Sequence, residues 1–116
     1  MKTEWHISTD IVNKASLDRW RKHHPAEFIS AFANLVKVLA RLKHGEPLGG
    51  FGLAPLKSEG GGLWRIAQSG KKGKKETRLY VFPHEGRMRV LRIGGKESQP
   101  TDIVEARKAI GKIKGE

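Results

Sequence analysis

The sequence contains no cysteine, which excludes disulfide bonds, thiolate catalysis and zinc–thiolate sites. It also has no apolar run that approaches the roughly eighteen residues of a membrane-spanning helix. The N-terminal segment, residues 1–5, lacks the apolar stretch of a secretory signal peptide. Together these absences predict a cytoplasmic protein that does not enter a membrane.

Acidic residues are scarce relative to basic ones. Twelve acidic residues stand against 23 lysines and arginines, which gives a formal net charge of +11. Residues 1–59 carry nine basic and six acidic residues, whereas residues 60–116 carry fourteen and six. A concentrated positive field attracts polyanions and speeds their association, so the charge favours a nucleic-acid partner over a role in solubility alone.

The length of 116 residues suits one domain, and no change in composition divides the chain. Hydrophobic residues make up 37% of the sequence, enough for one modest core. We therefore expect a single domain over residues 1–116.

Two helices are expected in the first half of the chain. Asn13 or Ser16 can cap the first helix, which ends near residues 23–25. Between residues 26 and 43 the apolar residues recur at helical intervals, which predicts a second helix with one buried stripe. This stripe consists of Phe28, Ile29, Phe32, Leu35, Val36, Leu39 and Leu42. Because the connection between the two helices is short, they should pack as an antiparallel hairpin.

The apolar period changes to two in the second half of the chain. Three segments rich in β-branched and aromatic residues predict antiparallel strands. They are residues 63–68, 77–83 and 87–94. Residues 5–8 alternate weakly and suggest a short edge strand, whereas residues 45–62 form a glycine- and proline-rich connection without periodicity.

A last helix is expected after Pro100 and Thr101, where Asp102 and Glu105 have the spacing of a capping box. The predicted fold is therefore α+β. An N-terminal helical hairpin packs on a small antiparallel sheet, and a C-terminal helix follows it.

Strand alternation predicts a basic face on this sheet. Successive side chains of a strand point to opposite faces. If the faces that carry Trp64, Ile66, Leu79, Val81, Leu91 and Ile93 pack on the helical hairpin, one arginine from each strand lies on the opposite, open face. These arginines are Arg65, Arg78 and Arg92, and Tyr80 accompanies them. Such a face is suited to binding phosphate groups.

Three segments of the second half share an order and spacing with a known family. Residues 61–66 (GGLWRI) are similar to a "GLWELR" entry into a strand, and residues 78–82 (RLYVF) to a "YRVFYF" strand. Residues 96–107 are similar to a "KKTQKTP..EI..A..R" passage into the C-terminal helix. In this order they resemble the RelE/ParE/HigB toxin superfamily, most closely its phage-derived HigB-type branch. The resemblance spans most of the chain and implies a RelE-like fold.

The resemblance also implies a function. Members of this family are toxins of type II toxin–antitoxin systems that cleave messenger RNA, usually on the ribosome. The ribose 2′-hydroxyl attacks the adjacent phosphorus and a 5′-hydroxyl leaves, without a metal or another cofactor. The expected partners are therefore mRNA, the ribosome and a cognate antitoxin protein.

The resemblance assigns catalytic roles to residues of the last strands. Arg78 matches the family's strand arginine and is expected to stabilise the phosphorane, while Arg92 and Lys96 match further basic positions. The family's first-strand arginine falls at Ala67 in this chain, and Arg65 on the same predicted face is the expected substitute. Tyr80 and His84 are the candidate general bases, of which Tyr80 would need a lowered pKa.

Other basic residues are expected to bind RNA without taking part in catalysis. The loop between the first two predicted strands carries Lys71, Lys72, Lys74 and Lys75, and Lys57 and Arg89 are further candidates. No metal site is expected, because no metal-ligand spacing joins the remaining histidines, which we interpret as surface or capping residues. They are His6, His23, His24 and His44.

Two alternative functions remain open from the sequence. One is a ParE-like protein that poisons DNA gyrase and needs no RNA-cleaving residues. The other is a non-catalytic RNA-binding module, which would bind RNA without cutting it.

Overall fold

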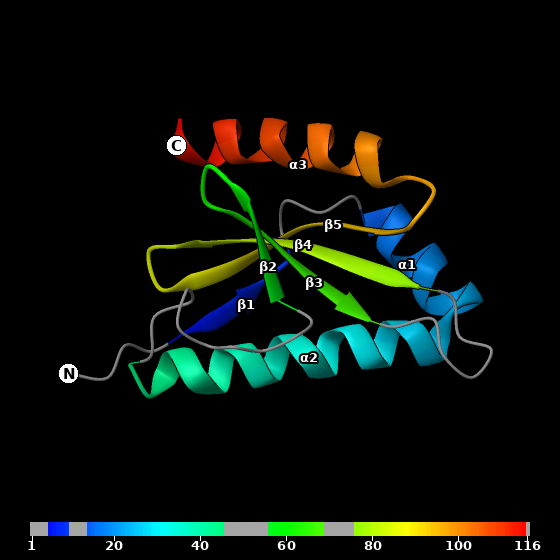
Figure 1. Ribbon diagram of the computed structural model, residues 1–116, viewed down its shortest axis with the longest axis horizontal. Coiled ribbons are helices and arrows are strands. Elements are labelled where there is room, and N and C mark those ends of the chain that lie inside the picture. Colours follow the sequence, from blue (N-terminus) through cyan, green and yellow to red (C-terminus); the bar gives the residue numbers. More distant parts are fainter. Residues whose placement is uncertain (1–4, 10–13, 46–55, 69–75, 116) are drawn as a thin grey trace.

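Five strands and three helices form the part of the chain that the computed structural model describes, residues 5–9, 14–45, 56–68 and 76–115. In chain order they are β1 (His6–Ser8), α1 (Lys14–His23), α2 (Pro25–Lys43), β2 (Leu56–Gly60), β3 (Leu63–Gln68), β4 (Thr77–His84), β5 (Arg87–Gly95) and α3 (Gln99–Lys114). The strands make one sheet in the order β1-β5-β4-β3-β2. Figure 1 shows three layers, with α3 on one side of the sheet and α2 on the other. The predicted α+β class is confirmed.

The sheet is mixed, whereas the sequence predicted an antiparallel one. β1 pairs with β5 in parallel, and the other neighbouring strands pair antiparallel. The expectation failed at this edge because the weak alternation over residues 5–8 carries no information about the direction of pairing.

Strand β2 lies in the segment that was predicted to be a connection without regular structure. Of its residues, Leu56 packs against the core, while Lys57, Ser58 and Glu59 are polar. A strand with one apolar contact shows no alternation, so the sequence pattern did not reveal it. A turn of three glycines with positive φ angles, at residues 60–62, joins β2 to β3.

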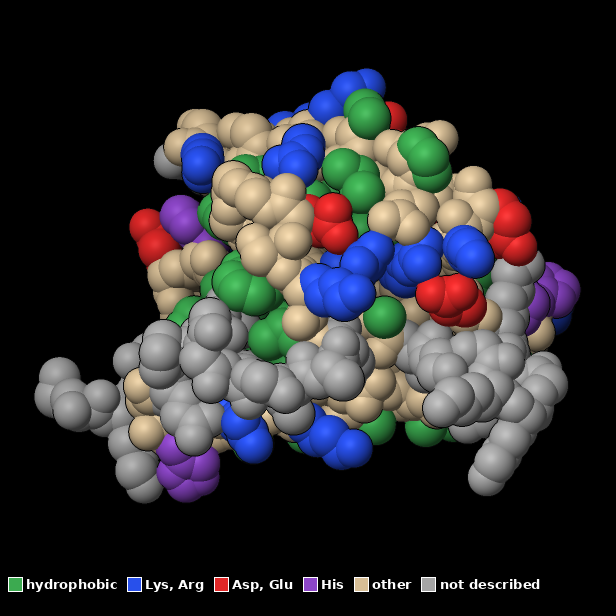
Figure 2. All heavy atoms as spheres, in the orientation of Figure 1, with side chains coloured by type: hydrophobic (Ala, Val, Ile, Leu, Met, Phe, Trp, Pro, Cys, Tyr) green, Lys and Arg blue, Asp and Glu red, His purple; other side chains and the backbone are tan. Residues whose placement is uncertain are grey.

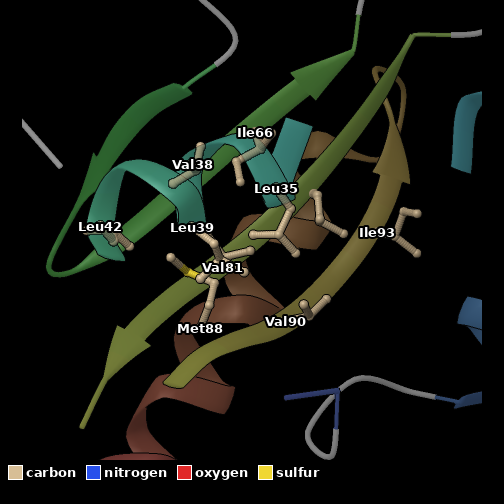
Figure 3. Close-up of a cluster of buried hydrophobic side chains, with 10 residues drawn as sticks. Leu35, Val38, Leu39, Leu42, Ile66, Val81, Met88, Val90 and Ile93 are labelled. Atoms are coloured by element: carbon tan, nitrogen blue, oxygen red, sulfur yellow. The ribbon is translucent and has the colours of Figure 1, made fainter. Parts of the chain in front are cut away.

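The larger core lies between the sheet and α2 (Figure 3). Its buried residues are Leu35, Val38, Leu39, Leu42, Ile66, Leu79, Val81, Met88, Val90 and Ile93. Trp64 packs on its border and is only partly buried. Two residues of the predicted helical stripe do not contribute, because Ile29 and Val36 are 67% and 56% exposed. The helix instead turns Ala31 and Val38 toward the interior.

A second core lies on the opposite side of the sheet, beneath α3. It joins Leu63, Tyr80, Phe82 and Leu91 of the strands to Ala106, Ile110 and Ile113 of the helix. The face that was predicted to be open is therefore partly covered by α3, and this expectation was wrong. Strand alternation locates the two faces of a sheet but does not indicate whether a later helix covers the second one.

A bulge in β5 changes which of its residues face α2. Tyr80 pairs with Arg92 and Val81 pairs with Val90, so Leu91 is the extra residue of β5. As a result Val90 belongs to the core under α2 and Leu91 to the core under α3. This reverses the predicted faces of both residues, because alternation alone assumes a regular strand.

Helix α3 begins earlier than the sequence indicated. Ser98 occupies its N-cap position and Pro100 lies in its first turn. The predicted capping box of Asp102 and Glu105 is absent, because Asp102 is already inside the helix and is 2% exposed. Within the described residues, none of the helices combines the length and the apolarity needed to cross a membrane.

Candidate functional site

The strand register gathers basic residues on the α3 side of the sheet. Arg65 lies opposite Tyr80, and Tyr80 lies opposite Arg92, so the three form one row across β3, β4 and β5. Lys57 extends this row onto β2, where it lies opposite Arg65 and is exposed. Arg78 lies two residues before Tyr80 on the same face of β4. We call Arg65, Arg78 and Arg92 the arginine cluster.

Each arginine of the cluster is paired with a carboxylate. Arg65 Nε is 3.4 Å from Glu59 Oε1, Arg78 Nη2 is 2.8 Å from Glu76 Oε1, and Arg92 Nε is 2.9 Å from Asp102 Oδ1. The three arginine side chains are 14%, 10% and 31% exposed. The arginines therefore do not extend freely into solvent as predicted, and neighbouring acids offset part of their charge. Figure 2, which views the layers from the side, shows basic side chains across the middle of the molecule with acidic ones beside them.

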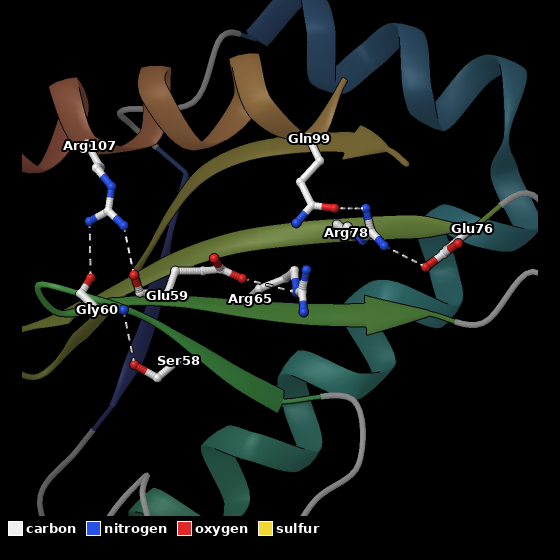
Figure 4. A network of polar contacts seen from close by, with 8 residues as sticks. All are labelled: Ser58, Glu59, Gly60, Arg65, Glu76, Arg78, Gln99 and Arg107. Atoms are coloured by element: carbon white, nitrogen blue, oxygen red, sulfur yellow. Dashed lines mark hydrogen bonds and ion pairs between the residues drawn. The ribbon is translucent and has the colours of Figure 1, made fainter. Parts of the chain in front are cut away.

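Arg78 connects the sheet to the start of α3. Its Nη1 donates a hydrogen bond to Oε1 of Gln99, the first residue of the helix, and its Nη2 donates to Glu76 (Figure 4). Directly opposite Arg78 on β3 lies Ala67, the position where the resembling family carries an arginine. Gln99 and Glu76 had not been identified from the sequence, because no motif marks an amide or a carboxylate as the partner of a distant arginine.

Three hydrogen-bond donors of this site are buried without a hydrogen-bond acceptor among the described residues. They are the hydroxyl of Tyr80 and the Nε atoms of Arg65 and Arg78. Arg65 Nε has its ion pair with Glu59, but the geometry is not that of a hydrogen bond. A buried donor without an acceptor costs about 1–3 kcal/mol, so each of these groups calls for a partner, which an ordered water or a bound anion can supply. At neutral pH each of the three groups can donate a hydrogen bond to an anion such as phosphate.

The Tyr80 hydroxyl stays protonated at neutral pH. Burial raises the pKa of Tyr80 to about 12, and the negative charge of Asp102 adds to the effect, while Arg78 and Arg65 oppose it. A general base would need a lowered pKa, so the structure does not support that role for Tyr80. The hydroxyl is instead suited to donating a hydrogen bond.

His84, the other candidate base, lies away from the arginine cluster. It is six residues from Arg78 at the other end of β4, a distance of about 20 Å along an extended strand. Its ring stacks on Phe82 with centroids 5.2 Å apart, and its Nε2 is 3.8 Å from Glu85 Oε1. The structure therefore does not bring His84 together with the arginines.

The remaining predicted site residues have different environments. Lys96 is exposed in the turn between β5 and α3, the same turn that brings Gln99 to Arg78. Arg89 is 4% exposed, so it cannot serve as the surface RNA contact that was predicted. It lies opposite Phe82 of β4, which belongs to the core beneath α3. The four lysines predicted to bind RNA from the loop, Lys71, Lys72, Lys74 and Lys75, lie outside the described residues.

The buried side chain of Asp102 is the centre of a polar network that the sequence did not indicate. Besides its ion pair with Arg92, its Oδ2 accepts a hydrogen bond of 2.6 Å from the Ser98 hydroxyl. Gly94 packs so closely against this network that a Cβ atom there would overlap the Asp102 carboxylate and the Ser98 hydroxyl. The network fixes the start of α3 relative to β5 and orients Arg92 within the arginine cluster.

Gly94→Ala is expected to lower the free energy of unfolding by about 1–3 kcal/mol, because the added methyl group must displace Asp102. Gly111→Ala is the matched control, since a Cβ at Gly111 in α3 meets no atom within 4 Å and should be neutral or slightly stabilising. Urea unfolding of both variants measures the difference. Equal stabilities of Gly94→Ala and the wild type would show that Asp102 does not lie against Gly94.

Metal ligands do not gather in the described part of the chain. There, no group of three or more histidine, aspartate or glutamate side chains is placed to hold a metal ion. His24 occupies the N-cap position of α2, with its Nδ1 3.4 Å from Glu27 Oε2, and its side chain makes no capping hydrogen bond.

Comparison of the chain with protein-family models, curated proteins and solved structures finds no match. The resemblance to the RelE/ParE/HigB superfamily therefore stays a prediction from local motifs. The function is accordingly argued from the site itself.

Proposed function

We propose that this protein binds RNA through its phosphate groups at the arginine cluster and cleaves it as a metal-independent endoribonuclease of the toxin type. The observation that supports the proposal is the set of buried donors on Tyr80, Arg65 and Arg78 that have no hydrogen-bond acceptor among the described residues. These donors come from neighbouring positions of two paired strands, so that one phosphate group can accept from more than one of them.

The chemistry of the proposed reaction suits these donors. When the 2′-oxygen attacks phosphorus and the 5′-oxygen leaves, negative charge builds up on the non-bridging oxygens of the phosphorane. Arginine stabilises such charge through its planar fork, and fixed donors that need no rearrangement stabilise the transition state most. The Tyr80 hydroxyl, protonated at neutral pH, would donate a further hydrogen bond to these oxygens.

The carboxylates that touch the cluster supply the proton acceptor in this proposal. Glu59 and Glu76 are 18% and 36% exposed, so each can leave its arginine when a phosphate replaces it. Either carboxylate could then take the proton of the attacking 2′-hydroxyl and return it to the leaving 5′-oxygen, which departs as the 5′-hydroxyl. Asp102 is less suitable, because both of its oxygens are engaged by Arg92 and Ser98.

The proposed biological setting is the bacterial type II toxin–antitoxin system, in the cytoplasm, with the ribosome presenting the mRNA. An acidic segment of a cognate antitoxin would neutralise the toxin by taking the place of RNA phosphates at the arginine cluster. The chain has 23 basic and 12 acidic residues, and this positive excess favours the binding of both RNA and an acidic antitoxin segment.

Primer extension on a reporter mRNA tests the proposal. With purified protein and programmed ribosomes, we expect cuts that leave 5′-hydroxyl and 2′,3′-cyclic phosphate ends. Ribosomes without the protein serve as the control. An intact reporter in spite of measurable RNA binding would refute the nuclease activity.

A non-catalytic RNA-binding module is the second candidate, and one observation favours it. Of the two bases suggested by the sequence, Tyr80 is held protonated and His84 lies at the far end of β4. Under this alternative the arginine cluster binds the RNA backbone and nothing is cut. The same primer-extension experiment, combined with a binding measurement, separates the two functions.

A further inference from the structure

A pocket of about 370 Å³ lies between α1, β5 and the beginning of α3. Figure 1 shows these elements meeting at one end of the molecule. Helix α1 contributes one face, whose residues follow the helical spacing i, i+3, i+4 and i+7. They are Ser16, Arg19, Trp20 and His23. From the sequence, His23 and His24 were interpreted as surface or capping residues, and no pattern marked this face of α1.

The opposite wall of the pocket belongs to the network around Asp102. Arg92, Gly94, Ser98 and Asp102 line it. The single acid in this lining is already engaged by Arg92 and Ser98, so it offers little charge to a ligand. Arg19 is exposed and has no ion pair in the described part of the chain. The pocket therefore presents a net positive lining.

An aromatic pair forms part of the pocket wall. The rings of Trp20 and His24 lie 4.7 Å apart at an angle of 47°, and both residues line the pocket. Aromatic side chains beside a positively charged groove are the arrangement with which proteins hold single-stranded nucleic acid, since every base has a π-face that can stack. The volume also lies within the range of about 300–1,000 Å³ typical of small-molecule sites.

Arg92 belongs to both the pocket and the arginine cluster. It stands in one row with Tyr80 and Arg65, two strand spacings from Arg65, or about 10 Å. A chain of phosphates that passes over the arginine cluster would therefore reach the pocket mouth at Arg92.

We propose that this pocket holds one nucleotide of the RNA strand, with the base against Trp20 and His24 and the phosphate at Arg19 and Arg92. The inference rests on the proposed RNA-binding function, because it extends the path of the same strand. An acidic peptide would use the arginines of the pocket but gain nothing from its aromatic wall.

Titration with the four 5′-mononucleotides, followed by NMR of the full-length protein, tests the proposal. At least one mononucleotide should shift the indole N–H signal of Trp20 and the amide signal of Gly94, while the Trp64 indole signal stays in place. Arg19→Ala should weaken this binding by about 10-fold. Arg21→Ala is the matched control, because Arg21 is also on α1, is 63% exposed and does not line the pocket. It should change the affinity by less than about twofold.

Three outcomes would overturn the pocket as a nucleotide site. They are an unchanged Trp20 signal, equal weakening by Arg19→Ala and Arg21→Ala, and equal binding of inorganic phosphate or tetraglutamate at the same residues. A parallel titration of the wild type and Arg78→Ala with a short RNA oligomer tests the proposed function independently of the pocket. If binding of the oligomer depends on Arg78 while the Trp20 indole signal does not shift, the nucleotide pocket is refuted and the proposed function stands. If mononucleotides shift the Trp20 indole signal while Arg78→Ala binds the oligomer as tightly as the wild type, the proposed function is refuted.

Discussion

Arg78→Ala is expected to reduce the rate of RNA cleavage by about 100- to 1,000-fold, the usual cost of removing one fixed donor from a charged transition state. Within the arginine cluster, Arg78 has the least exposed side chain, at 10%, and Gln99 and Glu76 hold two of its nitrogens. Among the described residues, its Nε finds no hydrogen-bond acceptor. Primer extension with ribosomes, using the purified variant, measures the loss.

The stability of this variant must be measured together with its activity. Because Arg78 is buried and bonded to α3, the alanine variant should lose about 1–2 kcal/mol of unfolding free energy yet remain folded. Arg78→Lys keeps the charge but loses the planar fork, and should still cleave poorly. Arg87→Ala is the control, since Arg87 is exposed at the other end of the sheet, opposite His84. Full cleavage by Arg78→Ala, or equal losses in Arg78→Ala and Arg87→Ala, would remove Arg78 from the site.

The sequence located the arginine cluster because strand alternation needs only local information. Arg65, Arg78 and Arg92 do share one face with Tyr80, as the period of two indicated. The surroundings of that face depend on segments far away in the chain. Helix α3 covers part of it, and the bulge at Leu91 shifts the pattern of β5. Neither feature has a signature in the local apolar pattern.

The acidic partners show why the electrostatics of the site could not be predicted from charge counting. Glu59 reaches Arg65 because β2 folds back on β3, and Asp102 reaches Arg92 because α3 starts at Gln99. Both placements depend on element boundaries that the sequence pattern did not locate. Strand alternation therefore predicted an open positive face, whereas the folded chain places a carboxylate beside every arginine of the cluster.

Tyr80→Phe is expected to weaken RNA binding or cleavage by about 10- to 100-fold while leaving the protein as stable as the wild type, or more stable by about 1 kcal/mol. The ring of Tyr80 is fully buried and its hydroxyl has no hydrogen-bond partner in the described residues. Removing such a hydroxyl relieves the cost of burying it, whereas removing a hydrogen-bonded one destabilises the fold. Urea unfolding and RNA titration of the two proteins measure both effects. A less stable variant with normal RNA binding would show that the hydroxyl has a structural partner and no role toward RNA.

The pH dependence of the same residue gives an independent test, because Tyr80 is the one tyrosine of the sequence. The phenolate absorbance of the folded protein should therefore rise around pH 12 instead of the ordinary 10. Since the folded state holds this proton more firmly than the unfolded state, the wild type should lose stability as the pH rises from 10 to 12. Tyr80→Phe lacks this contribution, so its stability should fall less over the same range. A phenolate signal that appears at pH 10 in the folded protein would show that the hydroxyl is open to solvent, and the site would lose its buried donor.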